Sequence, residues 1–96
     1  MKVSEILEIL RSYKAQSANR YGISRIGIFG SYVKGSPTQK SDIDIVIELQ
    51  NPDLFKMVHI KEDLEELLGV QVDIVRNRKE MNPYLKKRIE KEALYV

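Results

Sequence analysis

The sequence predicts an α/β (α+β) protein of 96 residues, built as a small mixed β-sheet with helices packed mainly on one face. Segments whose apolar residues recur at helical spacing alternate along the chain with short runs that are typical of strands. In two of these runs, 42–49 and 70–75, apolar and acidic residues alternate, so one face of the sheet is apolar and the other carries acids. At this length we expect one domain, residues 1–96, with a single modest core.

The N-terminal segment predicts a helix followed by a strand. Apolar residues recur at helical spacing over residues 3–10, Ser4 is a candidate N-cap, and the pattern fades before Gly22. The run 23–29 is rich in isoleucine and predicts a short, largely buried strand.

The middle of the chain predicts a turn, a strand and a longer helix. Residues 30–35 form a tight turn with about one helical turn, and the loop after it leads into the strand 42–49. A helix follows Asp53, with Gly69 as its candidate C-cap. The residues expected to face the core in this helix are Leu54, Val58, Leu64, Leu67 and Leu68.

The C-terminal segment predicts a third strand, a helix and a short edge strand. The third strand is 70–75. Asn82 is a typical N-cap and Pro83 suits the first helical position, with Leu85 and Ile89 on one face of the helix that follows. The last four residues add the edge strand.

Composition excludes several classes of protein. The hydrophobic fraction of 43% and the charged fraction of 31% are those of a globular protein, and no apolar run is long enough to span a membrane. Without cysteine there is neither a disulfide nor a thiolate metal site, so we expect a cytoplasmic protein. Residues 76–91 carry seven bases against two acids, but without interleaved aromatic residues direct nucleic-acid binding is not expected.

Three aspartates are the candidate metal ligands. In the strand 42–49 the isoleucines face the core, so Asp42 and Asp44 project together from the other face, and Asp73 does the same in the third strand. If these two strands are neighbours, the three carboxylates converge, and their repulsion calls for a cation. Oxygen ligands alone favour Mg²⁺ or Mn²⁺ over zinc. The alternative is that the acidic pair merely marks the beginning of a strand.

Gly30 and Ser31 are the candidate phosphate-binding residues. A glycine and a serine directly after a buried strand expose backbone N–H groups and a hydroxyl, the groups that hold phosphate oxygens. The spacing of Gly30 and Gly35 imitates half of a P-loop, but Ser36-Pro37 stand where that motif requires lysine and serine or threonine. The alternative to a phosphate-binding role is that these glycines serve only as turn residues.

The order Gly30-Ser31, ten intervening residues, Asp42-Ile43-Asp44 and a later acid resembles the nucleotidyltransferase superfamily that includes DNA polymerase beta. The run "GSYVKGSPTQKSDIDIVIEL" is most similar to the minimal nucleotidyltransferases (MNT), a group found as antitoxins beside HEPN-domain toxins. The resemblance covers essentially the whole chain and implies a polymerase beta-like core.

The resemblance also implies roles for individual residues. Asp42 and Asp44 would bind two Mg²⁺ ions, and Asp73 would hold the catalytic metal and help to activate the attacking hydroxyl. The implied nucleotide-binding residues are Gly30, Ser31, Lys34 and Ser41. Many members have Ala-Arg after the Gly-Ser-x turn, whereas this chain has Val33-Lys34, and a lysine cannot form the two-pronged contact of an arginine.

The implied activity is Mg²⁺-dependent transfer of AMP from ATP to a hydroxyl of a partner protein, with a tyrosine of a HEPN toxin as the leading acceptor. Two alternatives stay open: a module that neutralises its partner by contact without turnover, and a sensor that binds ATP·Mg²⁺ without transfer. The sequence leaves the acceptor, the base preference and a homo-oligomer open.

Overall fold

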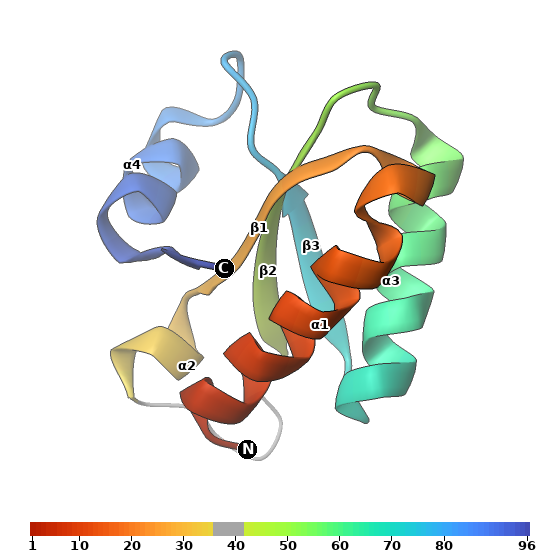
Figure 1. Cartoon of the computed structure of the whole chain (residues 1–96). Coiled ribbons are helices and arrows are strands. Elements are labelled where there is room, and N and C mark those ends of the chain that lie inside the picture. The colour runs from red at the N-terminus through yellow and green to blue at the C-terminus, as the bar shows by residue number, and fades with distance from the viewer. Residues whose placement is uncertain (36–41) are drawn as a thin grey trace.

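The computed structural model describes residues 1–35 and 42–96, and Figure 1 shows its path. Helices and strands alternate along the described chain, as the sequence predicts. In order they are α1 (Val3–Tyr21), β1 (Ile23–Phe29), α2 (Ser31–Lys34), β2 (Ile43–Leu49), α3 (Leu54–Leu68), β3 (Val72–Arg76), α4 (Pro83–Glu92) and β4 (Leu94–Tyr95). Among the described residues no helix is both long and apolar enough to cross a membrane.

The strands form one mixed sheet in the order β3-β2-β1-β4. β2 runs parallel to β3, whereas β1 is antiparallel to both β2 and β4. The register pairs Asp44 with Asp73 across β2 and β3, and pairs Asp44 with Phe29 across β2 and β1. The predicted C-terminal edge strand is confirmed as β4. The strands that carry the aspartates, β2 and β3, are neighbours.

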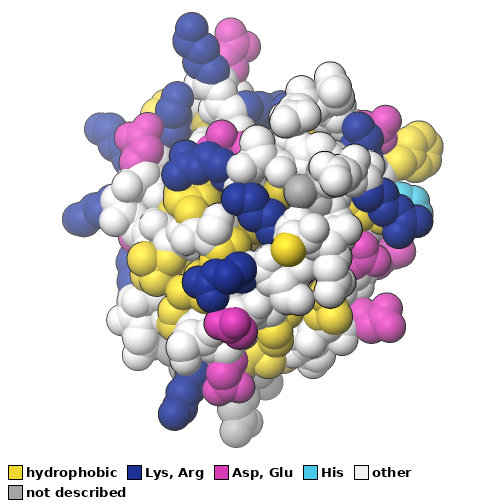
Figure 2. Space-filling model, in the orientation of Figure 1, with side chains coloured by type: hydrophobic (Ala, Val, Ile, Leu, Met, Phe, Trp, Pro, Cys, Tyr) yellow, Lys and Arg dark blue, Asp and Glu magenta, His cyan; other side chains and the backbone are white. Residues whose placement is uncertain are grey.

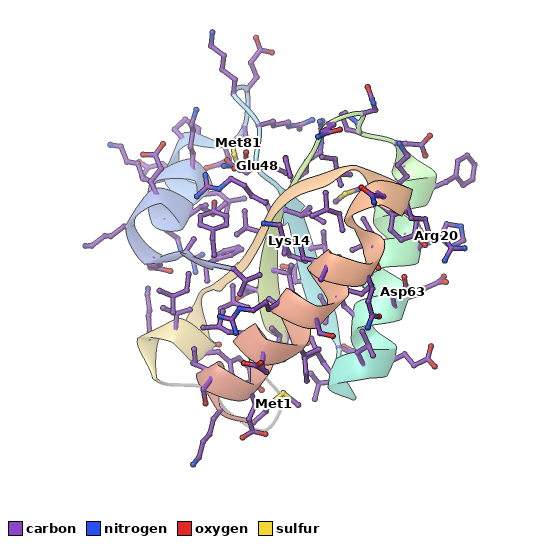
Figure 3. The ribbon with its side chains drawn as sticks, viewed as in Figure 1. Met1, Lys14, Arg20, Glu48, Asp63 and Met81 are labelled. Atoms are coloured by element: carbon purple, nitrogen blue, oxygen red, sulfur yellow. The ribbon has the colours of Figure 1, made fainter. Side chains whose placement is uncertain are left out.

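Helices α1 and α3 cover one face of the sheet and enclose the main core, as Figure 1 shows. Ile43, Ile45 and Ile47 of β2 are fully buried against this layer, so the predicted core face of β2 is confirmed. Asp63 of α3 points toward α1 in Figure 3, where it accepts a hydrogen bond of 2.9 Å from the hydroxyl of Tyr13. This bond ties the two helices together at the rim of the core.

The predicted core face of α3 is wrong for three of its five residues. Leu54, Val58 and Leu67 are 77%, 45% and 52% exposed, whereas Leu64 and Leu68 are buried. The third buried residue is Ile60, which precedes Leu64 by four positions. Because α3 packs along the edge strand β3, the row at i, i+4 and i+8 meets the sheet, with Met57 partly buried beside it, while Leu54, Val58 and Leu67 lie in solvent.

Helix α4 lies on the other face, which is the face of the acids. Ile89 packs there with Phe29 and Val46, all three buried, and Leu85 is partly buried beside them. The predicted packing of helices mainly on the face opposite the acids is confirmed for α1 and α3, and α4 is the exception. Helix α4 therefore covers the acid face over Val46, while the start of β2 is left accessible.

Local signals set most of the helix ends. The side chain of Asn82 accepts hydrogen bonds from the backbone of Tyr84 and Leu85, and Gly69 ends α3 with a left-handed φ of 71°, both as predicted. Ser4 is not the cap of α1, because the helix begins at Val3. The Glu5 carboxylate instead accepts a bond from the backbone N–H of Lys2, as in a capping box.

Charge is unevenly distributed along the chain and over the surface. On the face in Figure 2, Lys and Arg side chains are numerous over the α4 side and the middle, and several acidic side chains lie along the α3 edge, but both kinds also occur elsewhere on this face. In the sequence, the charged residues of 42–66 are mainly acidic and those of 76–91 are mainly basic.

Candidate active site

The parallel pairing of β2 and β3 brings two of the predicted metal ligands side by side. Asp44 and Asp73 are register partners on adjacent strands, which lie about 4.8 Å apart in a sheet, and both side chains emerge on the face of α4. Asp42 precedes Asp44 by two residues. Asp42 and Asp73 are exposed and Asp44 is half-buried, so the group opens to solvent at the start of β2.

The electrostatics of Asp44 show that negative charge accumulates at this point. Burial raises the pKa of the Asp44 carboxyl, and the nearby charge of Asp73 raises it further. Arg88 acts in the opposite direction and lowers this pKa, while Asp42 and Glu92 raise it. The carboxylates are thus only partly compensated by the protein's own cations.

This donor set fits a hard divalent cation. Carboxylate oxygens are the preferred ligands of Mg²⁺ and Mn²⁺, and a cation between the strands would relieve the repulsion that raises the pKa of Asp44. The described residues contain no group of three or more acidic, histidine or cysteine side chains already gathered around one metal position. The three-aspartate site therefore stays a prediction that rests on strand register and charge.

Glu48, the next acid along the same face of β2, is used in other contacts. Its carboxylate lies 3.3 Å from Arg25 and accepts a bond of 3.0 Å from the side-chain amide of Asn77. Figure 3 shows it at the end of the sheet away from α2. Since Val46 is buried between Glu48 and Asp44, Glu48 is not part of the candidate site.

The turn after β1 is pressed against Asp44. Gly30 is buried, with φ 81° and ψ −149°, a conformation that is essentially restricted to glycine. A Cβ atom on Gly30 would collide with the carboxylate of Asp44. Gly30 is therefore required both by its backbone and by the acid beside it, and the turn and the acids form one site. Ser31, half-buried, begins α2 directly after it.

The third predicted nucleotide-binding residue, Lys34, is held by an acid that the sequence analysis does not identify. Its ammonium lies 2.9 Å from Glu92, the last residue of α4. The same carboxylate accepts a bond of 3.3 Å from the backbone N–H of Gly30. Ser41, the fourth predicted nucleotide-binding residue, lies outside the described residues.

A second residue of α4 was also missed. The guanidinium of Arg88 lies 3.9 Å from the Glu92 carboxylate and 5.8 Å from the ring centre of Phe29, the register partner of Asp44. The only signal in the sequence is that Arg88 and Glu92 are four residues apart and so share one side of a helix. That spacing does not say which strand the helix meets.

A groove lies at the edge of the sheet beyond Asp73, between β3 and the start of α4. Its lining combines apolar and basic side chains. The residues are Ile74, Val75, Arg76, Arg78, Met81, Asn82 and Leu85. It adjoins the acids without including them.

Comparison with known proteins identifies the family of this chain. The model of the nucleotidyltransferase domain family matches residues 3–96. A relative named protein adenylyltransferase MntA, from Thermococcus cleftensis, is 36% identical over 97 residues, which cover 100% of this chain and 97% of the relative.

Solved structures show the same fold. One presented as a minimal nucleotidyltransferase is 33% identical, with a TM-score of 0.77 over 98% of this chain and 95% of its own. A second holds a tri-AMPylated Shewanella oneidensis HEPN toxin in complex with its MNT antitoxin; it is 22% identical, with a TM-score of 0.60 over 96% of this chain and 66% of its own. This chain belongs to the nucleotidyltransferase domain family and is of the minimal nucleotidyltransferase type.

Proposed function

We propose that this nucleotidyltransferase transfers AMP from ATP to a hydroxyl group of a partner protein, and that it acts as the antitoxin of a HEPN toxin in the cytoplasm. The observation that carries the proposal is the pairing of Asp44 with Asp73 next to the Gly30-Ser31 turn. The protein adenylyltransferase from Thermococcus cleftensis and the AMPylated toxin complex support the choice of AMP and of the partner.

In this proposal each group of residues has a separate task. The Gly30-Ser31 turn holds the β- and γ-phosphates of ATP, Lys34 is a further phosphate contact, and Ser41 is a further nucleotide-binding residue. Asp42, Asp44 and Asp73 would hold two Mg²⁺ ions, with Mn²⁺ as a substitute. When bound, such ions stabilise the attacking and leaving oxygens of an in-line displacement at the α-phosphorus.

The transfer forms one bond and breaks one. The acceptor oxygen bonds to the α-phosphorus, the bond from that phosphorus to the oxygen bridging to the β-phosphate breaks, and pyrophosphate leaves with the electron pair. Asp73 lies on the exposed edge strand, where it can take up the proton of the hydroxyl as that group arrives.

The acceptor is expected to come from another molecule. The described residues form one sheet with its covering helices and no separate acceptor-binding domain. The groove beside Asp73 is open to a partner's side chain. A tyrosine is our leading acceptor because the resemblance to the minimal nucleotidyltransferase antitoxins of HEPN toxins implies it.

The proposal is tested with purified protein, labelled ATP, Mg²⁺ and the product of the neighbouring gene. We expect covalent labelling of the partner by wild type and none by Asp44→Asn, which keeps the shape of the side chain but removes its charge. Tight complex formation and full neutralisation of the partner by Asp44→Asn would favour the contact-only module instead. ATP·Mg²⁺ binding without labelling of the partner would favour a sensor.

A further inference from the structure

Two side chains of α4 reach the candidate nucleotide site from a part of the chain about sixty residues away. Glu92 contacts the Gly30 N–H and the Lys34 ammonium, and Arg88 lies one helical turn before Glu92 on the same side of α4. The cluster formed by Lys34, Arg88 and Glu92 borders the Gly30 turn and Asp44. Neither member from α4 has a role in the function proposed above.

The carboxylate of Glu92 holds two cationic side chains, Lys34 and Arg88, next to each other. Its side chain is only 11% exposed, while those of Lys34 and Arg88 are 54% and 49% exposed. The hydrogen bond from Lys34 holds the pKa of Glu92 below its ordinary value, so the carboxylate is ionised at neutral pH. Lys34 has three donors and Arg88 has five, so each keeps donors that Glu92 does not use.

The position of Arg88 relative to the acids follows from the sheet. Its guanidinium lies over the ring of Phe29, and Phe29 is the register partner of Asp44 on the neighbouring strand. The guanidinium is therefore beside the start of β2, on the face where the acids emerge. It offers a planar, permanently charged fork, which lysine at position 34 cannot provide.

We propose that Arg88 binds the polyphosphate of the nucleotide together with Lys34, with Glu92 holding the two cations in place. Arg88 then adds a guanidinium from α4 to the ammonium of Lys34. This inference rests on the proposed function only because it takes a nucleoside triphosphate as the ligand. Inorganic tripolyphosphate has the same chain of charged phosphates and should bind to the same cations.

Charge supports a role for both cations. The site gathers Asp42, Asp44, Asp73 and Glu92, and a polyphosphate adds further negative charge. Metal ions at the three aspartates would offset the negative charge of those aspartates. The end of the phosphate chain would lie at the Gly30 turn instead, where the negative charge of Glu92 must be offset by nearby cations. The positive charge of Lys34 equals the negative charge of Glu92. With Arg88 added, the three side chains carry a net charge of about +1, which attracts phosphate.

Titration calorimetry with Mg²⁺ tests the proposal on three probes: ATP, inorganic tripolyphosphate and AMP. We expect Arg88→Gln to weaken binding of ATP and tripolyphosphate about tenfold or more, the scale of one charge-assisted hydrogen bond, and to leave AMP binding unchanged. Arg88→Lys should recover part of the loss. Lys87→Gln, an exposed cation at the next position of α4, is the matched control and should bind all three probes as wild type does.

Other outcomes would overturn the proposal. Equal ATP affinity of Arg88→Gln and wild type would mean that the guanidinium does not touch the phosphates. An equal loss for ATP and AMP, together with a lower melting temperature, would mean that Arg88 only supports the packing of α4. Absence of tripolyphosphate binding by wild type would also count against it.

A transfer assay on the same variants separates this inference from the proposed function. If wild type binds tripolyphosphate through Arg88 but labels no partner, the inference stands and the transferase role fails. If wild type labels its partner and Arg88→Gln does so with an unchanged KM for ATP, the transferase role stands and the inference fails.

Discussion

At the scale of single residues, the contact between Gly30 and Asp44 joins the phosphate turn to the acids. The turn residue has a backbone conformation that other residues avoid, and the acid fills the space in which a side chain would lie. Two elements that are separate in the sequence motif are thus in direct contact. Substitution of either residue is expected to disturb the other.

We predict that Gly30→Ala lowers the free energy of unfolding by about 2 kcal/mol or more, from backbone strain plus the collision with Asp44. It should also abolish ATP binding because Asp44 is displaced. The matched control is Gly69→Ala, whose φ of 71° is also positive but whose added Cβ meets nothing within 4 Å. Chemical denaturation and calorimetry measure both effects, and equal losses for the two variants would contradict the predicted contact.

Asp44 is predicted to lower the stability of the metal-free protein at neutral pH. Its pKa is raised by burial and by Asp73, so above the pKa of an unfolded aspartate the folded state bears the cost of an unfavourable carboxylate. That cost is removed as the pH falls through the raised pKa. Asp44→Asn should therefore be as stable as wild type or more stable at pH 7 in chelator.

The same variant provides its own control. The stability difference between Asp44→Asn and wild type should shrink to zero as the pH falls below about 3.9, where the carboxyl is protonated in both the folded and the unfolded state. Denaturation curves across this range measure the difference. A variant that is clearly less stable than wild type at pH 7 in chelator would show that Asp44 makes a favourable contact that the charges do not explain.

At the scale of elements, α4 divides the acid face of the sheet. Ile89 buries one side of this helix on Phe29 and Val46, and Arg88 and Glu92 meet the turn after β1. Between α4 and β3 lies the groove whose lining includes Arg76 and Arg78. Helix α4 is thus in a position to contact both the nucleotide and a partner.

We predict that the groove docks an acidic surface of the partner. Charge reversal at Arg76 or Arg78 should weaken association with the partner about tenfold, mostly through a slower association rate that depends on salt, and should leave ATP·Mg²⁺ binding unchanged. The control is Arg20→Glu, an exposed cation at the end of α1 on the opposite side of the sheet (Figure 3). Surface plasmon resonance at two salt concentrations distinguishes the variants, and equal effects of all three reversals would exclude the groove.

At the scale of the whole molecule, the acids make nucleotide binding conditional on metal. Carboxylates and phosphates repel each other unless cations lie between them. We predict that ATP with Mg²⁺, at one hundred times its dissociation constant, raises the melting temperature by roughly 10–20 °C, since such binding contributes about 2.7 kcal/mol to a domain of this size. ATP with chelator should give almost no shift, and an equal shift in both solutions would contradict metal dependence.

Much of the molecule could be predicted from the local pattern of residues. The alternation in 42–49 assigns Asp44 to the face opposite the isoleucines, because side chains on a strand have a period of two whatever lies around them. Asn82 and Gly69 mark helix ends through bonds and backbone angles that depend only on near neighbours. The spacing from Gly30-Ser31 to the aspartates is likewise a property of the sequence alone.

The tertiary structure decided what no local pattern contains. Strand order placed Asp73 beside Asp44, and packing along an edge strand left Leu54, Val58 and Leu67 of α3 exposed despite their helical spacing. The position of α4 brought Arg88 and Glu92 to the Gly30 turn. Periodicity says which residues share a face, whereas the partner of that face depends on contacts between segments distant in the chain.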